Sequence, residues 1–166
     1  ATRWLGADDV GLLASSAESR DQPKAAKDGD ASGQAPFDYD AAVRPEKEPP
    51  PSTPGAILRV SVDDRHWLGS GYAGEASVVH DSGHILTPVK LDRGTNVARY
   101  AAREELVRAG FLWDENARQL PEKAYLVHQP HGRGHVVAFA EDPNVRAFAD
   151  GLNLMLMNAL LLTAGR

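Results

Sequence analysis

Three histidines near residue 130 are the first residues whose type and spacing suggest chemistry. His128, His131 and His135 fall within eight residues, and neutral imidazole is a common ligand for zinc and copper. His80 and His84 repeat the i, i+4 spacing that binds zinc when it lies on a helix. Neither group is predicted to lie on a helix, because the surrounding residues favour strands and turns.

A catalytic zinc ion of the hydrolase type needs two histidines and a carboxylate, usually supplied by His-x-x-Glu or His-Glu-x-x-His. None of the six histidines has Asp or Glu three residues later, and none is followed directly by Glu. We therefore predict no metal site in this chain. His128, His131 and His135 remain candidates for adventitious metal binding, because a hairpin loop can bring His131 and His135 together. The interpretation we favour is solvated loop histidines that titrate near neutral pH.

A glycine-rich segment, Gly69–Gly74, matches the dinucleotide-binding pattern G-x-G-x-x-G, with Asp92 downstream. That chemistry needs a strand ending at the first glycine and a helix beginning after the last, so that free N–H groups meet the pyrophosphate. Here the preceding strand is predicted to end near Val62, and Glu75–His80 is β-branched and strand-like. The segment is therefore predicted to be a turn without a bound cofactor.

No side chain in the sequence is predicted to be a catalytic nucleophile, acid or base. Ser82 and Ser70 both lie beside glycine, but neither fits the Gly-x-Ser-x-Gly elbow of α/β-hydrolases. Asp81-Ser82-Gly83 has the small polar residues of a tight turn. The acidic pairs Asp63-Asp64 and Glu104-Glu105 are assigned to the surface. An unrecognised constellation around His66, His80 or His128 is a third, less favoured alternative.

Two side chains are candidates for binding another molecule. Trp113 lies between Gly110 and Asp114 in a loop or helix start, where an exposed aromatic would mark an interface. We favour the alternative that Trp113 packs under the neighbouring strands as core. Arg133, in the predicted loop Gln129–Gly134, offers a guanidinium fork to a carboxylate.

The elements that must position these residues form an α/β domain with a mixed sheet, hairpins and a long C-terminal helix. The closing helix is predicted to start with Asp142 as N-cap and Pro143 at its first position, and to end at Gly165. Short helices are predicted at 102–109 and 114–120. The expected strands and hairpins are a strand from Ile57 to Val62, a hairpin of Ala76–His80 with His84–Leu86, a strand at Asn96–Tyr100, and a hairpin of Lys123–His128 with Gly134–Ala140.

Composition divides the chain into three parts. Residues 1–14 contain a short amphipathic helix, Trp4–Leu13, with no partner in its own neighbourhood. Residues 15–54 hold seven of the 11 prolines and eight acids against five bases, which is typical of a linker or insertion. Residues 55–166 carry the α/β core. The sequence starts at Ala1, which favours a processed product or a piece of a longer protein.

Charge and cysteine content exclude several classes. With 18 Lys and Arg against 23 Asp and Glu, the net charge is −5, so we expect no nucleic-acid partner. The absence of cysteine excludes disulfides, thiolate zinc sites and cysteine nucleophiles. The longest nearly apolar stretch, Leu152–Ala164, contains two asparagines and is too short to cross a bilayer.

Ordered blocks along the chain resemble a known family. They are Pro50–Val60, Asp64–Tyr72, Gly110–Trp113, Gly132–Phe139 and Glu141–Phe148, with Trp4–Leu13 and Pro36–Tyr39 before them. Together they resemble the C-terminal domain of bacterial zinc metallocarboxypeptidase-like proteins of the carboxypeptidase A type. In that family a zinc peptidase domain precedes a domain similar to class I glutamine amidotransferases.

The resemblance implies an incomplete amidotransferase-like, flavodoxin-like fold whose first half, apart from the helical remnant at 1–14, precedes residue 1. It also implies that the zinc ligands lie in the missing peptidase domain, because no His-x-x-Glu occurs here. Amidotransferases hydrolyse glutamine with a cysteine thiolate, and this chain has no cysteine. Neither activity is therefore expected of this chain alone.

We accordingly expect a non-catalytic accessory domain fragment of a periplasmic or extracellular metallocarboxypeptidase-like hydrolase, with no cofactor of its own. Its expected partner is the zinc peptidase domain of the same protein. The isolated fragment is expected to expose apolar surface and to form a homodimer or dissolve poorly. The alternative is an autonomous peptide- or metal-binding module that uses the 128–135 hairpin loop.

Overall fold

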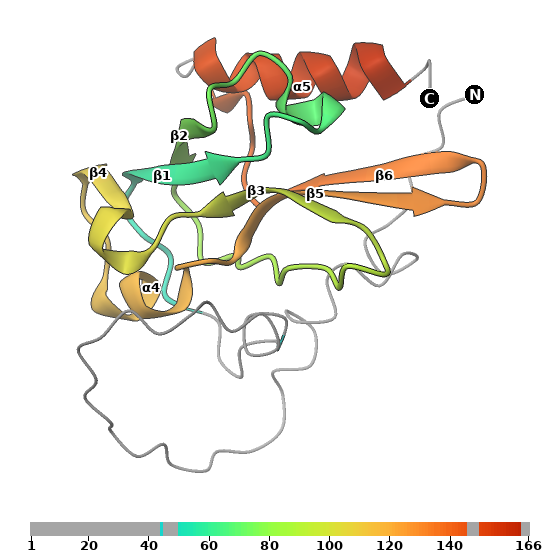
Figure 1. Cartoon of the computed structure of the whole chain (residues 1–166). Helices are drawn as coiled ribbons and strands as arrows, with labels where there is room; N and C mark the ends of the chain where they lie inside the picture. Colours follow the sequence, from blue (N-terminus) through green and yellow to red (C-terminus); the bar gives the residue numbers. More distant parts are fainter. Residues whose placement is uncertain (1–43, 45–49, 146–149, 164–166) are drawn as a thin grey trace.

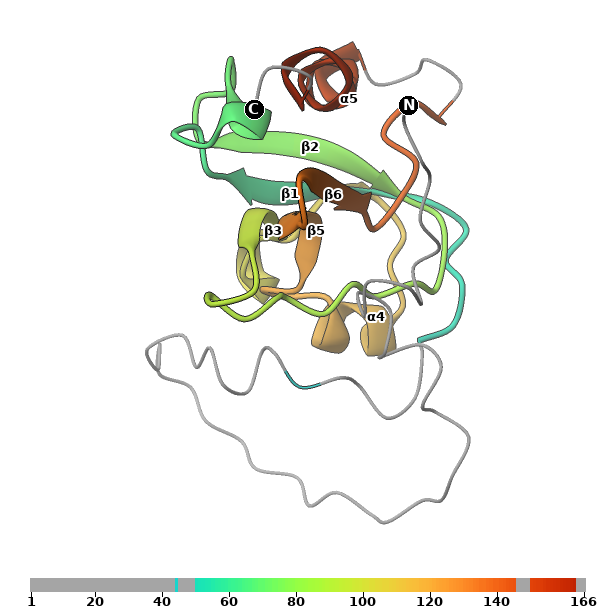
Figure 2. The same ribbon diagram turned by 90° about the vertical axis from the view of Figure 1, so that its right-hand side faces the viewer.

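A curled antiparallel sheet with one long helix across it forms the described part of the chain (Figures 1 and 2). This computed structural model describes residue 44, residues 50–145 and residues 150–163. The strand order is β2-β1-β3-β5-β6, and β4 also pairs with β1. The strands are β1 Ala56–Val62, β2 Glu75–His80, β3 Thr95–Tyr100, β4 Val107–Gly110, β5 Ala124–His131 and β6 Gly134–Phe139.

The helical elements are short except for the last. They are the 3₁₀ helices η1 Trp67–Gly69 and η2 Arg103–Glu105 and the α-helices α4 Asp114–Gln119 and α5 Asp150–Leu162. Among the described residues no helix is both long enough and apolar enough to cross a membrane.

Strand β1 is the centre of the sheet because its side chains alternate between the two faces. Ala56, Leu58, Val60 and Val62 are buried on one face, as a half-buried strand requires. β2 pairs along one edge of β1, and the other edge is shared by β4 and β3. β4 pairs with residues 56–58 of β1 and β3 with residues 60–62, and the pairing with β4 shifts register between Ile57 and Leu58.

The core lies inside the curl of the sheet and beneath α5. Tyr100, Leu126 and Val78 contribute from three strands, and α5 adds Leu152 and Met155 from its inner face. Burial of each large apolar side chain contributes roughly 1.5–3 kcal/mol relative to exposure. Helix α5 runs beside η1 and β2 (Figure 1).

Residues 63–74, which connect β1 to β2 and contain η1, form the η1 loop. This loop holds α5 by polar contacts as well as by packing. Asn158 on α5 donates from Nδ2 to the carbonyl oxygens of Leu68, at 3.0 Å, and Ser70, at 2.9 Å. The Tyr72 hydroxyl donates to the Gly151 carbonyl and accepts from the Met155 N–H at 3.1 Å. The Tyr72 hydroxyl therefore lies between the Gly151 carbonyl and the Met155 N–H, which would otherwise bond to each other in the first turn of the helix.

Residues 50–54 pack against the folded core. The Thr53 hydroxyl donates to the His80 carbonyl oxygen at 3.1 Å. Asn116 in α4 donates from Nδ2 to the Pro51 carbonyl at 3.0 Å, and the Trp113 indole donates to the Ser52 carbonyl at 3.2 Å. This short segment is thereby fixed along α4 and the end of β2.

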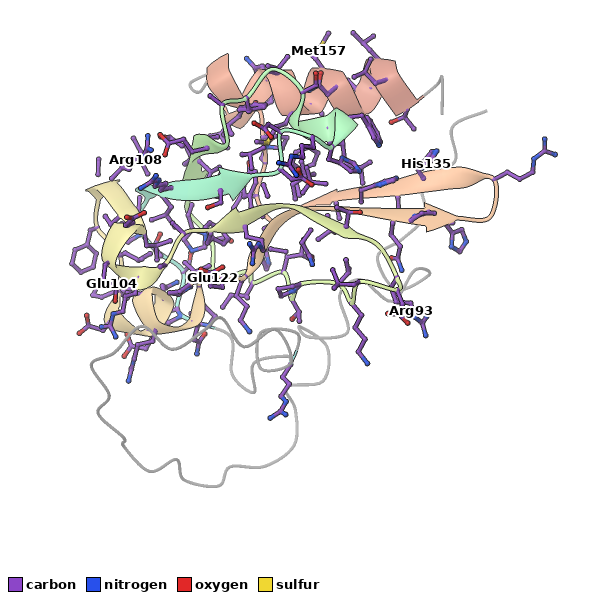
Figure 3. All side chains as sticks on the ribbon, in the orientation of Figure 1. Arg93, Glu104, Arg108, Glu122, His135 and Met157 are labelled. Carbon is purple, nitrogen blue, oxygen red and sulfur yellow. The ribbon has the colours of Figure 1, made fainter. Side chains whose placement is uncertain are left out.

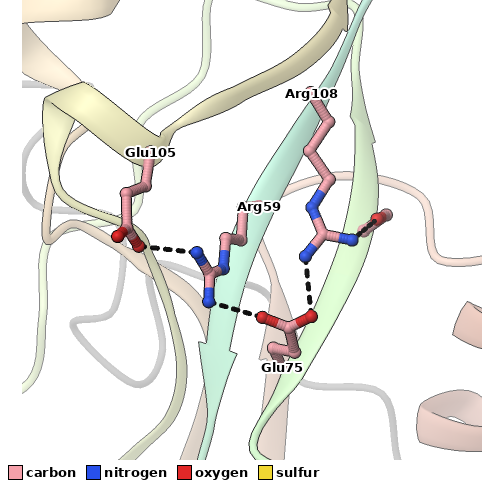
Figure 4. Close-up of polar contacts among 5 residues, drawn as sticks. Arg59, Glu75, Glu105 and Arg108 are labelled. Carbon is pink, nitrogen blue, oxygen red and sulfur yellow. Dashed lines mark hydrogen bonds and ion pairs between the residues drawn. The ribbon is translucent and has the colours of Figure 1, made fainter.

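A network of exposed ions crosses the outer surface of β1, β2 and β4 (Figure 4). Arg59 contacts Glu105 and Glu75, each at 2.6 Å, and Arg108 contacts the other oxygen of Glu75 at 2.8 Å. The two guanidinium groups lower the pKa of Glu75, first through the Arg108 hydrogen bond. Exposed pairs of this kind contribute little individually because water and salt screen them.

Several predicted elements are confirmed. They are the strand at Ile57–Val62, the strand at Asn96–Tyr100, the helix near 114–120, and the hairpin of Lys123–His128 with Gly134–Ala140. The glycine-rich segment Gly69–Gly74 is a 3₁₀ end and turn that leads directly into β2, with no helix after it.

Other predictions are wrong. β2 does not pair with His84–Leu86; Leu86 bridges Ala124 instead. The Ser82 hydroxyl accepts from the His84 N–H at 3.0 Å, and the chain leaves this turn away from β2. The predicted helix at 102–109 is only η2, followed by β4, where Gly110 has φ +86° and its backbone lies against Gly55.

The predicted mixed sheet is also corrected, since every pairing among the described strands is antiparallel. At Asp142 the carboxylate accepts from the Asn144 N–H at 2.8 Å, so the capping chemistry is present, but it closes a turn. The described helix α5 begins at Asp150. The predicted helix Trp4–Leu13 lies outside the described residues. So does Gly165, the predicted end of the closing helix.

Gly69→Ala tests how closely the η1 loop packs on β1. A Cβ at position 69 would collide with the Asp63 carbonyl oxygen, a backbone atom that cannot rotate away. We expect a loss of about 2–4 kcal/mol in the free energy of unfolding, measured by urea denaturation. Gly134→Ala is the control, because its nearest neighbour would be 3.8 Å from the new Cβ. Equal stability of the two variants would contradict this packing.

Candidate functional site

Three histidines from separate elements form a hydrogen-bonded row. His66 Nε2 lies 3.2 Å from His128 Nδ1, and His128 Nε2 lies 2.9 Å from His135 Nδ1. His66 is the N-cap of η1, and His128 lies on β5. His135 lies on β6 (Figure 3). We call these three residues the histidine row. It joins the η1 loop to the β5–β6 hairpin.

The hydrogen-bond accounting of the row fixes where its protons lie. The Leu68 N–H donates to His66 Nδ1 at 3.2 Å, so this nitrogen carries a lone pair and the proton of neutral His66 is on Nε2. His66 Nε2 then donates to His128 Nδ1, which leaves the proton of His128 on Nε2. His128 Nε2 donates in turn to His135 Nδ1. One backbone amide thereby sets the same neutral tautomer, Nε2–H, in all three rings.

A fourth ring covers the row. The Trp67 indole meets His128 edge to face at a centroid distance of 5.4 Å and His135 at 6.3 Å. His128 is 8% exposed and is the most enclosed of the three rings. Burial, together with the neighbouring His66 and His135, lowers the pKa of His128 to about 4.

The sign of the linked effect on stability follows from that shift. Between pH 6.5 and about 4 the unfolded chain binds a proton at His128 that the folded chain does not bind. The stability contributed by neutral His128 is therefore complete above pH 6.5. It is lost as the pH falls through the window from 6.5 to about 4.

The row differs from the predicted histidine cluster in its membership. His128 and His135 are brought together, but His131 lies exposed at the hairpin turn and has no place in the row. The third member is His66, which is 62 residues away from His128 in the chain. Nothing in the spacing of histidines predicts that partnership, which depends on β1 and β5 both flanking β3.

The geometry of the row opposes chelation by its own nitrogens. Each lone pair directed along the row already accepts an N–H, and a ligand nitrogen must offer its lone pair to the metal. Within residues 50–145 and 150–163, no three His, Asp or Glu side chains converge as ligands for one ion.

A cavity of about 430 Å³ opens beside one end of the row. Its lining combines His66 and His128 with the turn before β3, where Asp92 and Arg93 lie 4.0 Å apart. The remaining lining residues are Leu91, Gly94, Thr95 and Pro130. The cavity is thus a mixed polar and apolar hollow beside the base of the hairpin. Arg133, the predicted carboxylate-binding residue, lies in the exposed turn of that hairpin, outside the cavity lining.

A second polar cluster, Ser82–His80–Glu141, is buried between the two ends of the sheet. His80 ends β2, and Glu141 follows β6, so the contact joins the strands at the opposite ends of the strand order. His80 Nδ1 lies 2.5 Å from Glu141 Oε1, with side chains 0% and 5% exposed. The Ser82 hydroxyl donates to the same oxygen at 2.7 Å.

This cluster does not have the order of a catalytic triad. In a serine hydrolase the histidine lies between the serine and the acid and takes the proton of the hydroxyl. Here Ser82 donates to Glu141 directly, and the His80 ring is fully buried. The prediction that Ser82 is a turn residue is confirmed by its bond from His84 N–H.

Two tyrosines lie near the same carboxyl group. Burial raises the pKa of Tyr100 well above its usual range, and the negative charge of Glu141 adds to this effect. The same causes, in the same order, raise the pKa of Tyr125. The hydroxyls of both tyrosines and the ring nitrogens of His80 make no aligned hydrogen bond with any described residue. Buried polar groups without a protein partner usually bond to an ordered internal water.

Trp113 is not a core residue, so the favoured interpretation of this side chain is wrong. It is 42% exposed and meets the half-exposed ring of Phe111 edge to face at 4.7 Å. Its indole N–H donates to the Ser52 carbonyl at 3.2 Å, which keeps the ring at the surface over residues 50–54. The pair is an exposed aromatic corner beside α4.

No protein-family model, no curated protein and no solved structure matches this chain.

Glu141→Ala tests whether the buried cluster holds the sheet together. The change leaves the Ser82 hydroxyl without its acceptor inside the fold and removes the carboxylate that lies 2.5 Å from His80 Nδ1. We expect the free energy of unfolding to fall by about 2–4 kcal/mol, measured by urea denaturation. Glu105→Ala is the matched control, since it breaks an exposed pair with Arg59 and should cost less than about 1 kcal/mol. Similar losses in both variants would refute a structural role for the buried contact.

Proposed function

We propose that this chain is a non-catalytic accessory domain fragment that docks on a neighbouring domain through the outer face of α5. The observation that carries this proposal is a stripe of exposed apolar residues on α5, which we call the α5 stripe. It consists of Leu154, Met157, Leu160 and Leu161.

The composition of α5 favours a protein interface. The helix has no charged side chain from Gly151 to Leu162, and Leu160 and Leu161 are 58% and 64% exposed. Met157 points away from the sheet on the outer side of the helix (Figure 3). Contiguous exposed apolar surface on this scale usually marks a site of protein association.

The helix presents the stripe on a firm support. Its inner residues Leu152 and Met155 are buried in the core, and Asn158 is hydrogen-bonded to the η1 loop. A docking partner would therefore meet a preformed surface and would not have to order the helix first.

The proposed partner is the zinc peptidase domain of the same parent protein. The basis for this choice is the resemblance of the ordered sequence blocks to metallocarboxypeptidase-like proteins. On this proposal the parent is a periplasmic or secreted hydrolase that releases C-terminal residues from peptides, and zinc belongs to its peptidase domain. The described antiparallel strands would then be one part of an incomplete amidotransferase-like, flavodoxin-like domain, and the parallel strands typical of that fold would lie elsewhere in the parent.

The docking proposal is tested with the peptidase domain of the parent and the 166-residue chain. Leu160→Asp combined with Leu161→Asp should weaken binding at least tenfold in calorimetry, because two charges would have to be desolvated in the interface. Leu91→Asp is the control, since Leu91 is an exposed leucine away from α5. In the absence of the peptidase domain, we expect the unsubstituted chain to self-associate through the stripe. Unchanged binding by the double variant would contradict docking through α5.

The same preparation tests the non-catalytic part of the proposal. The chain alone, incubated with zinc and peptides that have a free C-terminus, should release no C-terminal residue. Zinc-dependent release of a C-terminal residue by an activity that co-purifies with the chain would overturn the non-catalytic part of the proposal.

The cavity beside the histidine row supports a second candidate function, a peptide-binding module built on the β5–β6 hairpin. Arg93 in the cavity lining and Arg133 in the hairpin turn could each offer a guanidinium group to a peptide carboxylate. Calorimetry with short peptides that have a free C-terminus would then give a heat that Arg93→Ala or Arg133→Ala reduces at least fivefold. Arg65→Ala is the charge-matched control. An unchanged heat in both test variants would remove this candidate.

A further inference from the structure

We propose that the histidine row is a proton-operated latch, which holds the η1 loop against the β5–β6 hairpin while its three rings are neutral and releases the loop when the row takes up a proton. The argument rests on the donor and acceptor positions in the row. It does not depend on the proposed docking function.

An added proton has no place in the row that preserves its hydrogen bonds. On His66 it would go to Nδ1, which already faces the Leu68 N–H. On His128 it would go to Nδ1, facing the Nε2–H of His66, and on His135 to Nδ1, facing the Nε2–H of His128. Each site therefore puts two N–H donors against each other at 2.9–3.2 Å and breaks one bond of the row.

Within residues 50–145 and 150–163, the titratable groups in contact with His128 are His66 from the η1 loop and His135 from β6, and a proton on either would repel one on His128. The turn before β3 contributes Asp92 and Arg93, which line the adjoining cavity and have opposite charges. The lowered pKa of His128 is consistent with this arrangement.

Release of the loop would reach α5 through hydrogen bonds already described. The carbonyls of Leu68 and Ser70, on either side of Gly69, accept from Asn158, and Tyr72 in the same loop enters the first turn of the helix. A loop that leaves the hairpin would therefore loosen the support of α5 while the centre of the sheet remains paired.

Amide hydrogen exchange on the full 166-residue chain tests the latch, with rates corrected for the intrinsic effect of pH. If His128 regains an ordinary pKa when the loop leaves it, the open population should rise about tenfold or more between pH 7.5 and pH 5. The expected result is a matching loss of protection at Leu68, Ser70 and Tyr72. The amides of Leu58 and Val60 in β1 should keep their protection over the same range.

Two variants show whether the pH dependence comes from the row. His128→Phe keeps a ring but cannot titrate, and should make the protection of Ser70 and Tyr72, whose amides bond to backbone carbonyls, low already at pH 7.5 and nearly independent of pH. His131→Asn removes an exposed hairpin histidine outside the row and should leave the transition unchanged. The unsubstituted chain alone can decide the question. Loop protection that is constant down to pH 5, or that falls together with the protection of Leu58 and Val60, would overturn the latch.

Discussion

The curled sheet is closed by side chains, and the rest of the structure depends on that closure. β2 and β6 are the ends of the strand order, and the described strands contain no ladder between them. The buried contact of His80 with Glu141 joins the two ends on one side. The histidine row ties the β5–β6 hairpin to the η1 loop on the other. Both junctions use imidazole rings, so the closure combines apolar burial with polar side chains.

The η1 loop transmits the state of the row to the surface of the molecule. In this loop His66 is the N-cap of η1, and Gly69 packs against the Asp63 carbonyl. Two of its carbonyl oxygens accept hydrogen bonds from Asn158. The inner face of α5 is thereby fixed, and its outer face carries the exposed stripe. The same few residues therefore link a titratable cluster to an apolar surface.

Local patterns predicted the elements whose causes are local. β1 shows the alternation of a half-buried strand, and β5 and β6 flank a loop rich in glycine. The sequence predicts the turn at Ser82 but not the pairing of Leu86, because Leu86 bridges Ala124, which is distant in the sequence. The helix expected over 102–109 fails where β1 recruits Val107–Gly110, a tertiary interaction that overrides helical propensity. Trp113 is at the surface because its indole N–H reaches the carbonyl of Ser52.

The candidate site was only half predictable for the same reason. His128 and His135 belong to one hairpin and were grouped from spacing, whereas His66 joins them through the sheet order. The central claim is that the Leu68 amide fixes one neutral tautomer in all three rings. Nitrogen-15 NMR of the histidine rings at pH 7.5 tests it most directly. The account predicts protonated Nε2 and unprotonated Nδ1 in His66, His128 and His135. A proton on Nδ1 of His66, or a cationic His128 at that pH, would contradict it.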